Sequence, residues 1–153
     1  MQKIEYRNID KNQLKNIAIN LQKKLSLGDK VYISGGLGAG KTQFIREFIH
    51  SAGYFDVVKS PSYSIVDIYE FNNKKIAHLD LFRLTTDSEF EDAGLDEYLT
   101  SKWLTLIEWP EMAKKILPKC EILINIKFSN DQTRRDLVIQ NFIPKKLNLS
   151  SKL

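Results

Sequence analysis

Residues 35–42 form a glycine-rich run that ends in lysine and threonine and reads GGLGAGKT. The run matches the pattern G-x-x-x-x-G-K-[ST], in which glycine backbone angles let successive N–H groups turn toward phosphate oxygens. The lysine of this pattern reaches the terminal phosphates, and the threonine hydroxyl takes a place on Mg²⁺. An apolar run precedes the motif and a helical pattern follows it, so the sequence predicts a nucleoside triphosphate site. The predicted nucleotide-binding residues of this loop are Gly35, Gly36, Leu37, Gly38, Ala39, Gly40, Lys41, Thr42 and Gln43.

Two acidic residues at the ends of apolar runs are candidates for the second half of the chemistry. Glu108 follows the run WLTLI, and Asp80 ends the run IAHLD, which His78 interrupts. A phosphate loop needs a carboxylate on a neighbouring strand to hold Mg²⁺ and a group that orients water. We expect Glu108 to be the metal carboxylate and Asp80 to orient water or support the metal shell. The predicted catalytic residues are therefore Lys41, Asp80 and Glu108, and the predicted metal ligands are Thr42, Glu108 and Asp80.

The segment KSPSYSIV, residues 59–66, lies between a helical pattern and a strand pattern. Pro61 fixes its own backbone angle and biases Ser60 toward an extended conformation. The hydroxyls of Ser62 and Ser64 then either face a γ-phosphate, as in a GTPase switch segment, or belong to a hydroxyl-rich turn. We include Ser62 among the candidate nucleotide-binding residues.

Three side chains near these motifs each have two interpretations. His78 is either a core histidine or a member of the site. Arg83 either pairs with nearby acids or faces phosphate or a partner. Trp109 lies between Glu108 and a proline and covers either a ligand or an interface, and we include it among the nucleotide-binding candidates.

The remaining patterns predict the elements that position these residues. Asp10 caps a helix with apolar residues at helical spacing, and the residues NNK join two strand patterns as a hairpin turn. We expect helices at 10–28, 42–52 and 110–117, short helices within 86–99, and strands at 30–34, 63–71, 75–84, 103–109, 121–129 and 135–141. The mixture predicts an α/β fold: a single-domain P-loop NTPase core whose helices flank a mixed parallel and antiparallel sheet.

The composition is that of one globular domain of 153 residues with a net charge of +4. The chain has no apolar run of membrane-spanning length and no apolar signal region, and its single cysteine cannot form an internal disulfide, so we expect a cytoplasmic protein. One cysteine and two distant histidines argue against a zinc site. Residues 144–153 carry three lysines and no acid. We expect this segment to be a basic, flexible tail after a P-loop ATPase domain over residues 1–143.

The order GxLGAGKT, SPSYS, HLDLFR and LIEWP over residues 30–118 resembles the TsaE (YjeE) family, the ATPases of bacterial tRNA threonylcarbamoyladenosine biosynthesis. The resemblance implies that the glycine-rich loop binds ATP and Mg²⁺, that Glu108 and Asp80 supply metal-linked carboxylates, and that residues 60–64 form a switch-like loop. It also implies that Arg83 and Trp109 lie in or near the active centre. The family usually has Asp, Thr and Tyr where this chain has Gly36, Ser62 and Phe82. The changes at Ser62 and Phe82 keep the needed chemistry, whereas Gly36 loses the side chain and any polar contact that it makes.

The same resemblance implies how the ATPase is used. Members of this family serve the TsaD and TsaB proteins, which modify the adenosine next to the anticodon of tRNA, so tRNA is an indirect partner. ATP hydrolysis resets the complex between turnovers, and hydrolysis by the isolated subunit is expected to be slow.

Other function classes share the phosphate loop. A small-molecule P-loop kinase is the leading alternative, but such enzymes usually carry an arginine-rich lid, and the few arginines of this chain cluster only at Arg134 and Arg135. The sequence has no Asn-Lys-x-Asp run for guanine recognition, which argues against a GTPase. A nucleotide-binding regulator without turnover is a third class, against which the two acids at strand ends argue.

Overall fold

The computed structural model describes residues 1–61 and 64–150, and within them a seven-stranded sheet has the strand order β1-β7-β6-β2-β5-β4-β3. The strands are β1 (Gln2–Ile9), β2 (Lys30–Gly35), β3 (Val66–Phe71), β4 (Lys74–Asp80), β5 (Leu104–Glu108), β6 (Ile122–Phe128) and β7 (Arg135–Asn141). The helices are α1 (Lys11–Gln22), α2 (Lys41–Ser51) and α3 (Asp87–Asp92), with 3₁₀ turns η1 (Leu95–Leu99) and η2 (Pro110–Ala113).

The centre of the sheet is parallel and its edges are antiparallel. Strand β2 runs parallel to both β5 and β6, and β4 runs parallel to β5. The outer pairs β3–β4, β6–β7 and β1–β7 are antiparallel. This arrangement confirms the predicted α/β fold with a mixed sheet. Because parallel strands end at the same edge, the glycine-rich loop after β2 lies beside the carboxyl ends of β4 and β5.

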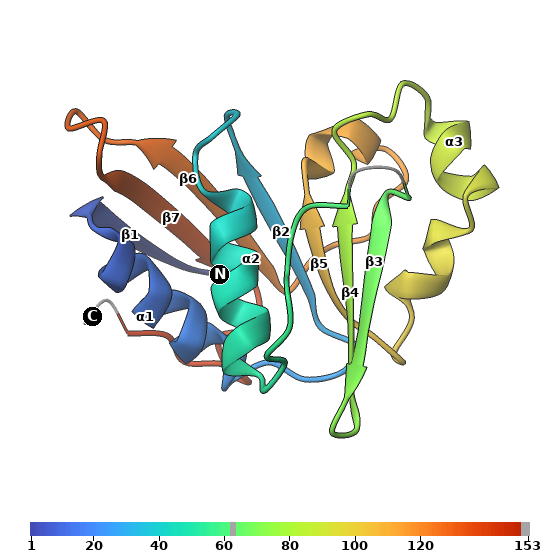
Figure 1. Ribbon diagram of the computed structural model, residues 1–153, viewed down its shortest axis with the longest axis horizontal. Coiled ribbons are helices and arrows are strands. Elements are labelled where there is room, and N and C mark those ends of the chain that lie inside the picture. The colour runs from blue at the N-terminus through green and yellow to red at the C-terminus, as the bar shows by residue number, and fades with distance from the viewer. Residues whose placement is uncertain (62–63, 151–153) are drawn as a thin grey trace.

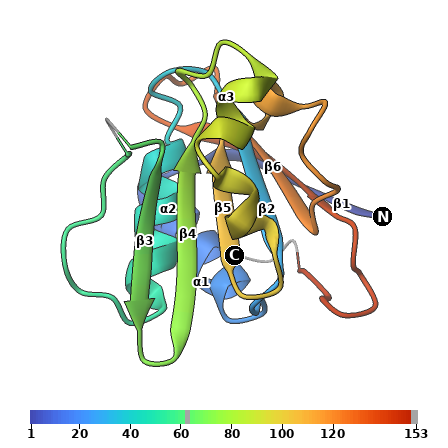
Figure 2. The ribbon, with the colours of Figure 1, turned by 90° about the vertical axis from the view of Figure 1, so that its right-hand side faces the viewer.

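Helices cover the two faces of the sheet at different places. Helices α1 and α2 lie side by side on one face (Figure 1), whereas α3 and η1 cover β4 and β5 on the opposite face (Figure 2). The pleat of β2 explains this division, because Val31 and Ile33 belong to the core under α1 and α2, whereas Tyr32 belongs to the core under α3. Core residues therefore pack against both faces of β2 and β5, the strands that lead into the site.

Asp10 caps α1 as predicted. Its carboxylate accepts a hydrogen bond from the backbone N–H of Gln13, and the Gln13 side chain accepts one from the Asp10 N–H in return. The NNK turn is also confirmed, since Asn72 and Asn73 both have the positive φ that a two-residue hairpin turn requires.

The helix predicted at 110–117 is wrong. The structure has only the 3₁₀ turn η2, and the backbone N–H groups of Ile116 and Leu117 both return to the carbonyl of Ala113. Two features prevent a longer helix. Its apolar face is short, because Ala113 is the buried residue between Glu111 and Lys115. Pro118 then follows, and a proline disfavours helical geometry at the residue before it.

Two strand boundaries differ from the prediction by more than one residue, the helix predicted to continue to residue 28 ends at Gln22, and one strand was not predicted. Strand β4 ends at Asp80 instead of continuing to residue 84, because the Asp80 carboxylate accepts a hydrogen bond from the Phe82 N–H and turns the chain. Strand β3 begins at Val66, after a residue with positive φ, Ile65. Strand β1 is half-buried at the sheet edge, so its sequence alternates between buried apolar and exposed charged residues and lacks a continuous apolar run.

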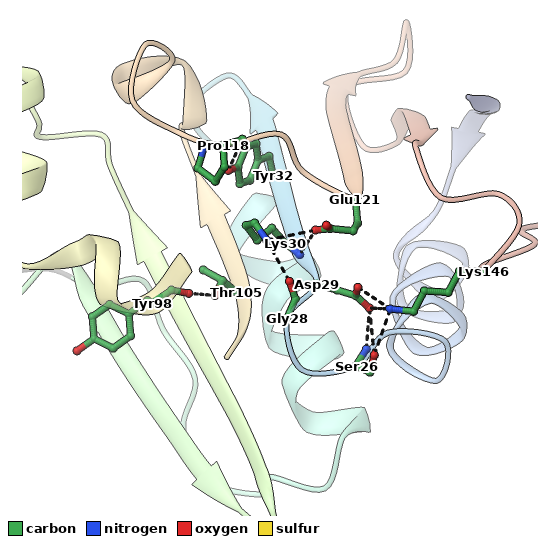
Figure 3. Close-up of polar contacts among 10 residues, drawn as sticks. All are labelled: Ser26, Gly28, Asp29, Lys30, Tyr32, Tyr98, Thr105, Pro118, Glu121 and Lys146. Carbon is green, nitrogen blue, oxygen red and sulfur yellow. Dashed lines mark hydrogen bonds and ion pairs between the residues drawn. The ribbon is translucent and has the colours of Figure 1, made fainter. Parts of the chain in front are cut away.

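Residues 144–150 do not stand apart from the domain as a flexible tail would. Leu147 is 2% exposed and belongs to the core under α1, and its carbonyl accepts a hydrogen bond from the Asn141 side chain. The ammonium of Lys146 contacts both carboxylate oxygens of buried Asp29, at 2.7 and 2.9 Å (Figure 3). The lysines that suggested a solvated tail therefore include one that pairs with a buried acid. Over residues 1–61 and 64–150, no helix is long and apolar enough to cross a membrane.

The substitution Leu147→Ala tests whether this segment is part of the fold. We expect the free energy of unfolding, measured by urea denaturation, to fall by about 2–3 kcal/mol, because the change leaves a cavity in the core. Lys145→Ala is the matched control, since Lys145 is exposed and its replacement should leave stability unchanged. Equal stability of both variants and the wild type would show that the segment is dispensable.

Candidate nucleotide-binding site

The glycine-rich loop has a backbone that side chains would prevent. Gly38 and Gly40 have φ values of 72° and 111°, in the left-handed region that glycine adopts without strain. Gly35 is required for a different reason, because a Cβ atom there would lie 2.4 Å from the carbonyl oxygen of Ile126 on β6. At Gly36 a Cβ atom would meet nothing within 4 Å. The loop therefore tolerates the family's Asp at position 36 sterically, and Gly36 leaves that space open.

Lys41 is folded back onto its own loop. Its Nζ donates to the carbonyl oxygens of Gly35 at 2.6 Å and Gly36 at 2.8 Å, and it lies 4.1 Å from the ring centroid of Trp109. Burial lowers the pKa of the Lys41 ammonium, and the nearby Glu108 carboxylate opposes this shift. An anion that enters the site can therefore compete with these neutral carbonyl oxygens for the Lys41 ammonium.

Glu108 is the central carboxylate of the site. Its side chain is 3% exposed. One oxygen, Oε1, accepts a hydrogen bond from the Thr42 hydroxyl at 2.9 Å. The other, Oε2, lies 2.7 Å from Nε2 of His78 and 3.4 Å from the hydroxyl of Ser60, which also contacts Thr42. The carboxylate thus joins β5, β4, the start of α2 and the segment at residue 60.

His78 is a buried core histidine and also a member of the site, so both interpretations of this residue from the sequence hold. The side chain has no solvent exposure, and its Nδ1 has no hydrogen-bond partner among the described residues. Nε2 is therefore the nitrogen that contacts protein, and its N–H donates to Glu108 in the arrangement that satisfies the carboxylate. His78 fixes one oxygen of Glu108 and leaves the other to Thr42.

Asp80 lies beside Glu108 but makes different contacts. The two residues are paired in the parallel register of β4 and β5. The Asp80 carboxylate accepts a hydrogen bond from the backbone N–H of Phe82 at 3.1 Å. Burial raises the pKa of the Asp80 carboxyl above its ordinary value. The two acids thus differ in their contacts. Glu108 binds the Thr42 hydroxyl, whereas Asp80 lines the cavity with a carboxylate that burial makes more basic.

Trp109 has an unusual backbone that aims its ring at the site. Its φ of 58° and ψ of 50° lie in the left-handed region, which costs a non-glycine residue about 1–2 kcal/mol. The conformation is held by a hydrogen bond from its N–H to the carbonyl of Ile33 and by the ring of Phe82, whose centroid is 4.9 Å away. The Trp109 ring consequently lies against the Lys41 ammonium.

These side chains surround a cavity of about 250 Å³ at the carboxyl edge of the sheet. Most of the predicted site residues line it, together with Ser60 and Phe82. The lining residues are Leu37, Gly38, Ala39, Gly40, Lys41, Thr42, Gln43, Ser60, Asp80, Phe82, Glu108 and Trp109. Gly35 and Gly36 contribute their carbonyls to Lys41 instead of lining the cavity.

Some candidates from the sequence lie elsewhere. Ser62 lies outside the described residues. The Ser64 hydroxyl donates to the carbonyl of Val66, so it belongs to a local turn. Arg83 is exposed on the turn after β4. Among the described residues of this segment, the hydroxyl that reaches the site is that of Ser60, next to the proline that biases its backbone.

One contact to the loop could not be inferred from the sequence. Arg135, at the start of β7, donates from Nε to the carbonyl of Ala39 at 2.6 Å and from an η nitrogen to that of Gly38 at 3.3 Å. The pair Arg134–Arg135 was visible as a cluster, but its contact with the loop depends on the pairing of β6 with β7, which brings position 135 beside the loop.

The donor set fits Mg²⁺ accompanying a nucleotide. Mg²⁺ prefers oxygen ligands, takes one or two from the protein and completes its octahedron with water and phosphate oxygens. Thr42 Oγ1 and Glu108 Oε1, 2.9 Å apart, are such a pair. Among the described residues no group of three or more His, Cys, Asp or Glu side chains is arranged to hold a metal alone. A metal at this site would depend on phosphate oxygens.

Comparison with known proteins gives a consistent result. A family model described as "Threonylcarbamoyl adenosine biosynthesis protein TsaE" matches residues 9–137. The tRNA threonylcarbamoyladenosine biosynthesis protein TsaE of Haemophilus influenzae is 38% identical over 117 residues, which cover 76% of this chain and 74% of that protein. The protein of the same name from Bacillus subtilis is 32% identical over 134 residues, covering 88% and 84%. The crystal structure of Bacillus subtilis YdiB is similar with a TM-score of 0.77 and 26% identity, covering 92% of this chain and 86% of that one.

The two adjacent glycines of the loop provide a matched pair of substitutions. Gly35→Ala should lower the free energy of unfolding by about 3 kcal/mol, because its Cβ would collide with the backbone of β6. Gly36→Ala should leave stability unchanged, because its Cβ meets open space. Chemical denaturation of both variants measures the difference. Similar losses in the two variants would contradict the close approach of the loop to β6.

Proposed function

This chain belongs to the TsaE family of threonylcarbamoyl adenosine biosynthesis proteins, and from that premise we propose that it is a Mg²⁺-dependent ATPase serving tRNA modification in the cytoplasm. Its proposed partners are the TsaD and TsaB proteins, with ATP hydrolysis resetting their complex between turnovers and tRNA bound through the complex. The observation that carries the ATPase proposal is the convergence of Lys41, Thr42 and Glu108 on one cavity beside a glycine-rich loop.

Lys41 supplies the first part of the proposed mechanism. In the structure its ammonium is bound to two loop carbonyls and lies over the face of Trp109. The β- and γ-phosphates of ATP carry full negative charge, so they compete well for a partly desolvated ammonium that neutral carbonyls hold. Binding then transfers Lys41 from the loop to the phosphates, where it stabilises charge on the transferred group.

Thr42 and Glu108 supply the second part. These two residues would hold Mg²⁺, which would supply positive charge to neutralise the phosphates. The Thr42 hydroxyl donates to Glu108, and its oxygen would be available as a ligand of the cation. His78 donates to the other oxygen of Glu108, so it keeps the carboxylate oriented while Thr42 changes partner.

Asp80 is the group best placed to orient the attacking water. It lines the cavity next to Glu108, and burial raises the pKa of its carboxyl. A more basic carboxylate accepts a stronger hydrogen bond from water. This assignment gives the two acids separate roles, with Glu108 toward the metal and Asp80 toward the water.

The rim of the cavity favours completion of the site by a partner. Leu37 is 71% exposed, and Phe82 is 45% exposed, although both line the cavity. Apolar side chains around an open catalytic cavity gain stability when a second protein covers them, and such a partner also excludes water. Slow hydrolysis by the isolated chain, faster in the presence of TsaD and TsaB, follows from this arrangement.

Two substitutions test the assigned roles. Lys41→Ala should reduce ATP hydrolysis roughly 100-fold or more, because it removes the principal cation of the phosphate site. Asp80→Asn should reduce hydrolysis by a similar factor, roughly 100-fold, by weakening the hold on water. Stability of Asp80→Asn at pH 7 should not fall. The raised pKa means that the charged carboxyl is less favourable in the folded than in the unfolded protein.

The measurements are phosphate release from ATP and tRNA threonylcarbamoylation reconstituted with TsaD and TsaB. Lys115→Ala, on the exposed turn after η2, is the control and should retain both activities. Full tRNA modification with Lys41→Ala would refute the proposal. Phosphate transferred from ATP to a small molecule would instead support a kinase, and a preference for GTP would support a GTPase.

A further inference from the structure

We propose that Arg135 is a positioning residue that holds the phosphate loop in its binding conformation from outside the cavity. The inference rests on the proposed function, because it assigns the loop to phosphate binding. Arg135 is not among the described residues that line the cavity. It therefore acts on the loop backbone and not on the phosphates.

The guanidinium of Arg135 is fixed on several sides. It donates to the carbonyls of Ala39 and Gly38 at 2.6 and 3.3 Å, and to those of Gln132 and Arg134 at 3.1 and 3.0 Å. Its central carbon lies 4.1 Å from the ring centroid of Phe128, the residue paired with it across β6 and β7. These contacts use nearly all of its N–H donors, so little capacity remains for a phosphate.

The direction of these bonds orients the loop. No peptide bond in residues 1–61 and 64–150 is cis, and in a trans peptide the C=O of one residue and the N–H of the next point in opposite directions. The Ala39 carbonyl faces Arg135, so the N–H of Gly40 faces away from it. This is the direction that an N–H must take to meet a phosphate held on the other side of the loop.

The contacts that Lys41 makes within the loop are to the carbonyls of Gly35 and Gly36 at its start, so Arg135 adds a constraint on the following residues Gly38 and Ala39. Gly38 and Gly40 adopt positive φ, but glycine populates many other backbone conformations almost as readily, so the sequence alone leaves the loop mobile. A guanidinium that binds two successive carbonyls selects one of these conformations before ATP arrives. Preorganisation of this kind reduces the entropy lost on binding.

Arg135 is itself anchored by the hairpin that carries it. The hydroxyl of Ser129 donates to the side-chain oxygen of Asn8 at 3.0 Å, and Arg134 donates to the Asn8 carbonyl at 3.1 Å. Asp136 accepts from the Asn8 N–H at 2.8 Å. The end of β1 therefore fixes the β6–β7 hairpin, and the hairpin fixes the guanidinium against the loop.

A lysine cannot reproduce this set of contacts. Its ammonium carries the same charge but lacks the planar fork that binds two carbonyls while stacking on an aromatic ring. The substitution Arg135→Lys consequently separates geometry from charge. Arg134→Lys is the matched control, because Arg134 binds the Asn8 carbonyl and not the loop, and a lysine at this position can still donate to that carbonyl.

The test measures the dissociation constant for ATP with Mg²⁺ by isothermal titration calorimetry in the full chain. Arg135→Lys and Arg135→Ala should both raise it roughly tenfold, the effect of one lost charge-assisted hydrogen bond. Arg134→Lys should bind as the wild type does. Wild-type affinity in Arg135→Lys would overturn the proposal, because it would show that charge alone is sufficient.

Amide hydrogen exchange distinguishes positioning from a general structural role. In Arg135→Lys the amides of residues 36–40 should exchange faster, whereas those of β6 and β7 keep their protection. Faster exchange throughout both strands would overturn the proposal by showing a loss of the hairpin. If the folded wild type fails to bind ATP, the proposed function fails; if it binds ATP and Arg135→Lys binds equally well, only the role of Arg135 fails.

Discussion

Glu108 places a carboxylate at the end of β5 with only 3% of its side chain exposed, and a buried charge of this kind costs several kcal/mol unless it is paired and hydrogen-bonded. The cost is offset by His78, Thr42 and Ser60, which come from three other parts of the chain. The parallel register of β2, β4 and β5 brings these parts to one edge of the sheet. The need to satisfy one carboxylate thus connects the central strands, the start of α2 and the segment at residue 60.

The residues that would hold a nucleotide and its metal are joined to one another by internal contacts in the structure. Lys41 is bound to carbonyls of the loop, and Thr42 is bound to Glu108. The phosphates of ATP would replace the loop carbonyls as partners of Lys41, and Mg²⁺ would replace Glu108 as the partner of Thr42. Neither exchange requires the sheet to move. The contact between His78 and Glu108 would stay unchanged, so His78 would fix the carboxylate while Thr42 exchanged its partner. The site is therefore preorganised in its strands and in the backbone of its loop, and adjustable in the side chains of Lys41 and Thr42.

The position and backbone geometry of the loop could be predicted from the sequence because the motif is local. Eight consecutive residues determine the cradle, the lysine and the hydroxyl, and the strand before them is a continuous apolar run. The acids at the ends of β4 and β5 could also be predicted, because parallel strands bring their carboxyl ends together. The order of the strands could not, and neither could the contact of Arg135 with the loop, which depends on that order.

The errors of sequence interpretation have related causes. The lysines of residues 144–150 suggested a solvated tail, but Leu147 and the pairing of Lys146 with Asp29 connect this segment to distant parts of the chain. Strand β1 was missed because one of its faces is exposed and charged. The role of His78 could not be decided, because burial and function coincide at that residue. In each case a long-range contact determines the outcome, and local patterns do not contain it.

The claim that Glu108 is the metal-linked carboxylate is tested most directly by the Mg²⁺ dependence of ATP binding in Glu108→Gln. Glutamine keeps the shape of the side chain and can still accept a hydrogen bond from His78, so the site should remain folded. Calorimetric titration with and without Mg²⁺ should show that the metal strengthens ATP binding to the wild type and has little effect on the variant. An equal gain in affinity from Mg²⁺ in both proteins would contradict the role of Glu108.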